Sequence, residues 1–143
     1  MGRLIAAVLI CLSAFTVPAG VSPTSVRDRS EFWALLGKAR ASHHVAALQW
    51  NGRLSERSAR WSKTMSQTGF RHSNIGELLG PYNFVGENIG TGTNTTPAAL
   101  HKAFMNSPDH RDNILNSGFT SAGIGVYVQD HTIWVTVEFA RRS

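Results

Sequence analysis

The spacing of apolar residues changes near Gly118, and this change constrains the fold more than any other feature of the chain. Before it, apolar side chains such as Phe32 and Leu36 recur at helical spacing. After it, Gly123–Gln129 and Thr132–Ala140 read as two strands. Helices early and strands late, without alternating strand and helix, predict an α+β fold in which helices pack on an antiparallel sheet.

The last two strands should form a β-hairpin with its turn at Asp130-His131. Successive side chains of a strand point to opposite faces of the sheet. One face of the final strand should therefore carry Trp134, Thr136 and Glu138, and the other Val135, Val137 and Phe139.

Capping residues predict where the helices begin. The expected N-caps are Ser30, Asn51, Thr96 and Ser107. Proline follows the last two caps, where it loses no needed hydrogen-bond donor. The first helix should end near Ser42 and the second at Gly69. Between the second and third helices we expect a loop at Ile75–Pro81, a strand at Val85–Ile89 and a flexible turn at Gly90–Thr95.

The N-terminal residues 1–20 have the layout of a secretory signal peptide. A short basic start precedes the apolar run Leu4–Val17, which is too short to span a bilayer comfortably, and small residues follow near Ala19 and Gly20. We expect residues 21–29 to form a flexible leader and residues 30–143 a single domain. The expected product is secreted to the extracellular or cell-envelope space and has no stable membrane span after cleavage.

The only cysteine, Cys11, lies inside the expected signal peptide. Ile10 precedes it, where a lipoprotein signal would need a small residue. A mature chain without cysteine must be stable without disulfides, and it excludes thiolate nucleophiles and thiolate metal sites. The net charge is +5, but the basic residues are scattered and not interleaved with aromatics. Nucleic-acid binding therefore has little support.

Three residues in the middle of the chain could carry chemistry: His72, Glu87 and His110. Each is flanked by turn-forming or capping residues, and the expected supporting residues are Ser73, Asn88, Ser107 and Asn113. Two imidazoles and a carboxylate can bind a divalent metal, shuttle a proton or simply stabilise a small core. A helix N-terminus disfavours the protonated form of His110, which leaves a neutral imidazole available.

Strand parity makes Glu138 a fourth candidate, although sequence alone does not show whether its face meets the site. The other histidines lack comparable turn-forming or capping neighbours and are expected to be solvated. They are His43, His44, His101 and His131. The chain contains no Gly-x-Ser-x-Gly elbow and no His-Glu-x-x-His helix, so those hydrolase classes have no support.

The order of these motifs resembles the CAP superfamily, or SCP-like extracellular domain, in its short bacterial form. The resemblance covers about Glu31 to Ala140. It rests on the first helix with Arg40, on Leu48-Gln49-Trp50-Asn51 with Leu54, and on four later segments: His72-Ser73, Gly86-Glu87-Asn88-Ile89, Ser107 to Leu115 and Trp134-Val135-Thr136. It implies an α-β-α sandwich with a three-stranded antiparallel sheet between helical layers.

The resemblance also implies a central cavity lined by two histidines and acidic residues, which in some relatives holds a divalent metal such as zinc. His72, Glu87 and His110 match three of those positions. The fourth position, often a glutamate, falls at Ser107, and a common tryptophan of the family is Phe104 here. The missing acid weakens the case for a two-carboxylate acid/base mechanism.

Three functions remain open at this point. The favoured one is a secreted binding module for a lipid, a sterol or a cell-envelope ligand, with a divalent cation such as Zn²⁺ in the cavity. The alternative is a zinc-assisted hydrolase or peptidase that uses His72, Glu87 and His110. The third is a structural or interaction module in which these polar residues only specify the fold.

Overall fold

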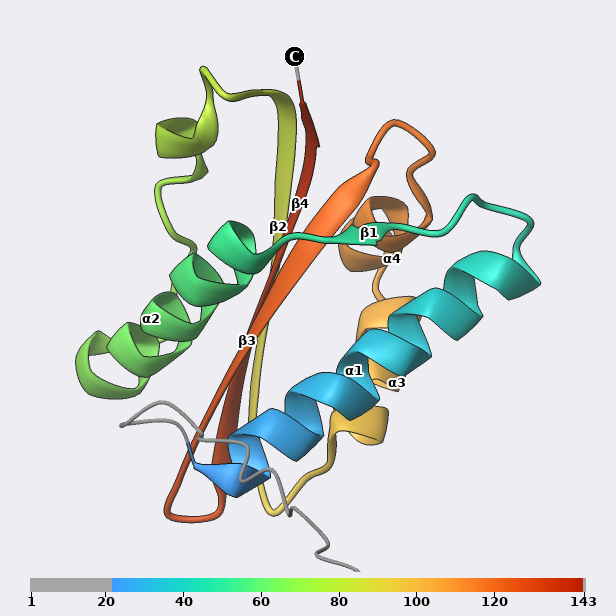
Figure 1. The fold of residues 1–143 in the computed structure, drawn as a ribbon. Helices are drawn as coiled ribbons and strands as arrows, with labels where there is room; N and C mark the ends of the chain where they lie inside the picture. Colours follow the sequence, from blue (N-terminus) through green and yellow to red (C-terminus); the bar gives the residue numbers. More distant parts are fainter. Residues whose placement is uncertain (1–21, 143) are drawn as a thin grey trace, which may run out of the picture.

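The computed structural model describes residues 22–142 of the chain. The expected signal peptide, residues 1–20, lies outside the described residues. Figure 1 shows the order of the elements. They are α1 (Pro23–Ser42), β1 (Gln49–Trp50), α2 (Gly52–Thr68), a 3₁₀ turn η1 (Ile75–Leu78), β2 (Tyr82–Thr93), α3 (Pro97–Asn106), α4 (Pro108–Leu115), β3 (Ser121–Gln129) and β4 (Thr132–Arg142).

The sheet lies between two helical layers, as the α-β-α expectation requires. Helix α2 covers one face, and α1 covers the other together with α3 and α4 (Figure 1). The strand order is β1-β3-β4-β2. The pairs β3–β4 and β4–β2 are antiparallel, but the two-residue strand β1 pairs with β3 in parallel. The sheet is therefore mixed and four-stranded, which corrects the expected three-stranded sheet.

The first helix begins earlier than expected. Ser22 is its N-cap, because its hydroxyl accepts a hydrogen bond from the Ser25 amide, and Pro23 occupies the first turn. Residues 23–29 are therefore helical rather than a flexible leader, and Ser30 is not the cap. The Ser30 hydroxyl instead donates back to the Val26 carbonyl within the helix.

The alternation of β4 is as predicted. The face toward α1 carries Val135, Val137 and Phe139, which are fully buried in the main apolar core. The opposite face carries Thr136 and Glu138 toward α2, and both are also fully buried. Apolar burial is the main favourable contribution to folding, so the α1 side holds most of the core.

Helix α2 lies directly against the backbone of β3. Ser55 and Ser62 on α2 donate hydrogen bonds to the carbonyls of Ile124 and Gly125 on β3. A Cβ at Gly125 would lie 2.0 Å from the Ala59 backbone nitrogen. Only a residue without a side chain permits so close an approach of helix and strand.

Strand β2 is longer than expected and lies at one edge of the sheet. It continues to Thr93, so most of the expected flexible turn at Gly90–Thr95 is strand. Because β2 pairs only with β4, its outer side is open to residues from both helical layers. The candidate residues meet at this edge.

Candidate functional site at the β2 edge

The segment that follows α2 carries His72 to the β2 edge. Gly69 ends α2 with a φ of 107°, a backbone conformation that glycine adopts without strain. The Nδ1 atom of His72 lies 2.8 Å from Oε1 of Glu87 on β2. A carboxylate only accepts hydrogen bonds, so Nδ1 carries a proton, and in the neutral ring the Nε2 lone pair is free. The ring itself is 63% exposed.

Glu87 is buried on the α2 side of β2, and both of its carboxylate oxygens have partners. Oε1 accepts from His72 and from the Ser73 amide at 2.9 Å, and Oε2 accepts from the Ser73 hydroxyl. A buried carboxylate is tolerated when it is hydrogen-bonded in this way. Glu87 therefore holds and orients the His72 ring.

His110 reaches the same edge from α4, in the other helical layer. Its Nδ1 atom lies 2.8 Å from the hydroxyl of Ser107, and its ring stacks on Phe104 with centroids 4.7 Å apart. Burial lowers the pKa of His110, as does the charge of the nearby His72, whereas Asp109 raises it. The ring is therefore neutral at neutral pH, as predicted, although burial is the main cause.

Two asparagines fix α4 against β2. The Asn88 side chain donates to the His110 carbonyl at 2.9 Å, and Asn113 donates to Oδ1 of Asn88 at 2.9 Å. Asn113 also donates to the Glu87 carbonyl at 3.3 Å and so ties α4 to β2. Asn88 contacts the backbone of His110 rather than the Glu87 carboxylate.

Glu138, which sequence left undecided, lies next to this cluster. It pairs with Glu87 in the register of β4 and β2, and its side chain is fully buried. Arg57 on α2 donates to Oε1 of Glu138, while Oε2 has no hydrogen-bond partner in the described part of the chain. Burial raises the pKa of Glu138 to about 7. The charge of Glu87 also raises this pKa, whereas Arg57 and Ser58 lower it.

Sequence reasoning missed Arg57, which connects the cluster to the surface. Besides Glu138, its guanidinium donates to the Ser73 hydroxyl at 3.1 Å and to the Asn74 carbonyl at 2.9 Å. A glutamate on a buried strand face needs a cationic or hydrogen-bonding partner, and that need was the available signal. Which of the 14 basic residues provides it depends on tertiary packing.

The raised pKa of Glu138 predicts a loss of stability as the pH rises. In the unfolded chain this carboxyl titrates near 4.5, and in the fold near 7. Between these values the folded protein binds more protons than the unfolded chain. The stabilisation that protonated Glu138 provides is therefore fully present below the unfolded pKa, and it is lost as the pH rises through the folded pKa. Relative to Glu138→Gln, the wild-type free energy of unfolding should fall by about 3 kcal/mol across this range.

Urea denaturation of both proteins between pH 4.5 and 8 measures this difference. The comparison is necessary because burial lowers the pKa values of His101 and His110, and those two groups oppose the trend. If the difference between wild type and Glu138→Gln does not change with pH, Glu138 does not titrate in this range.

His101 corrects one expectation, because it is buried rather than solvated. The residue is 8% exposed, and its ring packs edge-on against Phe32 with centroids 5.6 Å apart. Its Nε2 atom has no hydrogen-bond partner in the described structure, and burial lowers its pKa. His101 therefore belongs to the packing between α1 and α3 and not to the site.

The predicted metal ligands lie at the same edge of the sheet but do not form a ready-made set of three. Residues 22–142 contain no group of three or more histidine, cysteine or acidic side chains with metal-binding geometry. Glu87 faces His72 and Ser73, which leaves the two imidazoles as the available donors. Their Nε2 atoms have no hydrogen-bond partner among the described residues.

No helix within residues 22–142 is long and apolar enough to cross a membrane. The fold resembles an extracellular SCP-domain protein of Bacillus anthracis str. Ames, with a TM-score of 0.73 and 23% identity over 85% of this chain and 44% of that one. It also resembles an outer surface protein of Borrelia burgdorferi, with a TM-score of 0.74 and 16% identity over 82% of this chain and 94% of that one.

In sequence, the chain is 51% identical over 53 residues to the uncharacterized protein YkwD of Bacillus subtilis (strain 168). That stretch is 37% of this chain and only 20% of YkwD. Residues 33–139 match the CAP family, described as the cysteine-rich secretory protein family. The match covers most of the chain, including the His72, Glu87 and His110 segments. The chain therefore belongs to the CAP family, as the order of its motifs predicted.

Proposed function

We propose that this CAP domain is a secreted ligand-binding module in which His72 and His110 hold a divalent cation such as Zn²⁺. The observation that carries the proposal is the hydrogen bond from Nδ1 of His72 to the buried Glu87 carboxylate. In metal sites, such a carboxylate fixes the tautomer and orientation of a histidine ligand and increases its basicity.

The second imidazole is suited to the same task. His110 is anchored by Ser107 and by stacking on Phe104, and burial lowers its pKa, so the ring remains neutral at neutral pH. A histidine must be neutral to bind a metal ion. A bound cation would act as a Lewis acid and accept oxygen donors from a ligand.

The arrangement favours binding over zinc-assisted hydrolysis. Catalytic zinc sites use three protein ligands and one water. Here two imidazoles would leave several coordination positions for ligand atoms, while Glu87 is fully occupied in orienting His72. The N-terminal signal-like segment and the extracellular relative support a role outside the cytoplasm.

Zinc binding by purified residues 22–143 tests the proposal. Equilibrium dialysis should show saturable zinc uptake by the wild type, and both His72→Ala and His110→Ala should abolish it. Glu87→Gln should weaken zinc affinity by about 10- to 100-fold, because the orienting carboxylate is lost. Zinc at 100 times its dissociation constant should stabilise the wild type by about 2.7 kcal/mol.

His44→Asn is the matched control. It removes an exposed imidazole at a left-handed backbone position, φ 57°, that asparagine tolerates. Zinc uptake should be unchanged in this variant. If the two alanine variants bind zinc as the wild type does, the proposal is wrong. If the wild type binds no zinc and His72→Ala only lowers the melting temperature, the cluster serves the fold alone.

A further inference from the structure

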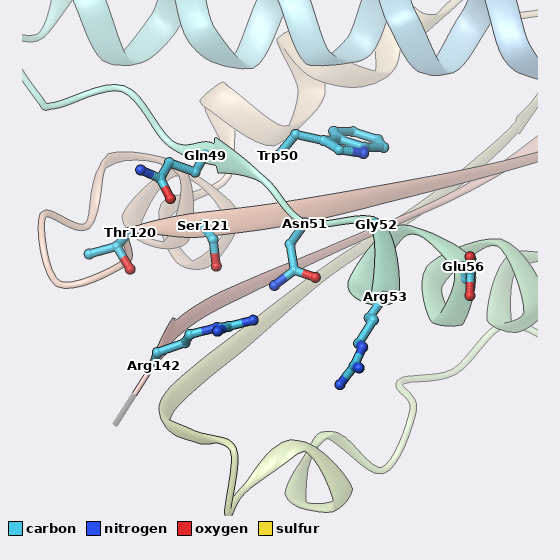
Figure 2. A pocket seen from close by; sticks show the side chains of 9 residues that line it. All are labelled: Gln49, Trp50, Asn51, Gly52, Arg53, Glu56, Thr120, Ser121 and Arg142. Atoms are coloured by element: carbon cyan, nitrogen blue, oxygen red, sulfur yellow. The ribbon is translucent and has the colours of Figure 1, made fainter.

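Two hollows adjoin each other beside the start of α2. The first measures about 790 Å³ and is lined by Gln49, Trp50, Asn51, Gly52, Arg53, Glu56, Thr120, Ser121 and Arg142. Figure 2 shows Arg53 and Arg142 extending from opposite sides of this hollow, from the start of α2 and the end of β4. The second hollow measures about 500 Å³, and the same two arginines line it. The two hollows share Arg53 and Arg142 in their linings, and we name the surface that they make up the arginine groove.

The cations of the arginine groove are largely uncompensated. Besides the two shared arginines, Arg57 and Arg60 line the second hollow. Arg57 is engaged with Glu138. The side chains of Arg53, Arg60 and Arg142 have no acidic, hydrogen-bonding or aromatic partner within residues 22–142. Glu56 is the one acidic side chain among the described residues that line the groove.

The walls of the groove are polar in one half and apolar in the other. Gln49 and Thr120 present side chains without hydrogen-bond partners in the described structure, and these can pair with hydroxyl groups. The second half has an apolar base that includes Leu78 and Tyr82. Asn51 donates to the Tyr82 hydroxyl at 2.8 Å and so joins the two halves into one fixed surface.

We propose that the arginine groove binds a hydroxyl-rich polyanion, namely a stretch of phosphodiester-linked polyol or glycan polymer. Guanidinium groups recognise phosphate through paired hydrogen bonds, and the polar wall can satisfy hydroxyl groups between successive phosphates. This site goes beyond the proposed metal function, because none of its lining residues is His72, Glu87 or His110.

The shape of the groove favours a polymer over a single phosphate or a membrane surface. Arg60 and Arg142 lie in different elements, α2 and β4, and the groove extends from residues near Arg60 to Thr120. A single phosphate would occupy only part of this length. A membrane surface would favour several exposed apolar side chains beside the cations, whereas Trp50 is the one large apolar side chain among the described residues that line the first hollow.

The test uses residues 22–143 and a soluble poly(glycerol phosphate) of defined length. Isothermal titration calorimetry should show saturable binding that weakens steadily as NaCl is raised, while dextran of similar length should not bind. Arg53→Ala/Arg142→Ala should weaken binding by at least about tenfold, since both substitutions remove charge-assisted hydrogen bonds to phosphate. Lys38→Ala/Lys102→Ala removes the same charge from exposed positions on α1 and α3 and should retain wild-type affinity.

Four outcomes would overturn the proposal. One is no saturable binding of the polymer, and another is an equal loss in the arginine and lysine double variants, which would indicate unspecific charge attraction. A third is tighter binding to vesicles of phosphatidylglycerol and phosphatidylcholine than to the polymer, which would indicate a membrane surface. The fourth is loss of polymer binding in His72→Ala/His110→Ala, because the arginine groove should bind with or without the metal site.

Discussion

Gly125→Ala is expected to destabilise the domain by more than about 3 kcal/mol, at or above the upper end of overpacking effects. The added Cβ would lie 2.0 Å from the Ala59 nitrogen and 2.1 Å from the Ser58 carbonyl carbon. These are backbone atoms of α2, so no side-chain rotation relieves the contact. Helix α2 must move away from β3, which weakens the Ser62 hydrogen bond to the Gly125 carbonyl.

Urea denaturation followed by circular dichroism measures this loss. Gly37→Ala is the matched control, since a Cβ there meets no atom within 4 Å and the residue lies inside α1. Alanine at that position should stabilise the domain by about 0.5–1 kcal/mol. A Gly125→Ala protein with near-wild-type stability would show that α2 does not lie this close to β3.

Arg40→Met is expected to cost about 3–5 kcal/mol, because it leaves several buried carbonyl groups without donors. The Arg40 side chain is 1% exposed. Its guanidinium donates to the Ala46 carbonyl at 2.7 Å, to the Ile114 carbonyl at 2.8 Å and to the Asn116 carbonyl at 3.0 Å. These groups join the end of α1 to the segment that ends α4, the helix that carries His110.

Two further variants separate the effect from a general loss of charge. Arg40→Lys keeps the charge but not the planar fork, so it should restore only part of the stability. Lys38→Met, an exposed change on the same helix, should stay within about 0.5 kcal/mol of wild type. If Arg40→Met is as stable as Lys38→Met, the Arg40 hydrogen bonds contribute little to the fold.

Local signals in the sequence account for most of the fold. The hairpin turn lies at Asp130-His131, where both residues have the positive φ of a two-residue turn, 48° and 61°. The caps at Asn51 and Thr96 also make their expected hydrogen bonds. The missed start of α1 carried a similar signal, Ser22-Pro23, which resembles Thr96-Pro97 but directly follows the signal-like segment.

The features that sequence did not predict depend on contacts between distant residues. Strand β1 has only two residues and no local pattern, and it exists because Gln49 and Trp50 pair with β3. The partners of Arg40 and Arg57 are backbone and carboxylate oxygens from other elements. Neither arginine differs locally from a solvated surface residue, so its role follows only from the packing.

The site could be predicted only in part, because some of its contacts also join residues that are distant in the sequence. His72 and Glu87 were singled out by their turn and strand neighbours, and the structure places them in contact. Sequence did not show that Glu87 would orient His72 rather than serve as a third metal ligand. That role depends on Ser73, which donates hydrogen bonds to both oxygens of the Glu87 carboxylate. The link to Glu138 required the register of β2 and β4, which no local pattern specifies.

The backbone contact between α2 and β3 also limits where this domain can change shape. Separating helix and strand would break the serine hydrogen bonds to the β3 carbonyls, so we expect the two elements to move together. A conformational response near His72 must therefore arise in the connection between Gly69 and Tyr82, with Gly69 as its hinge. Arg57 reaches from the rigid part to the Asn74 carbonyl and limits how far that connection can swing.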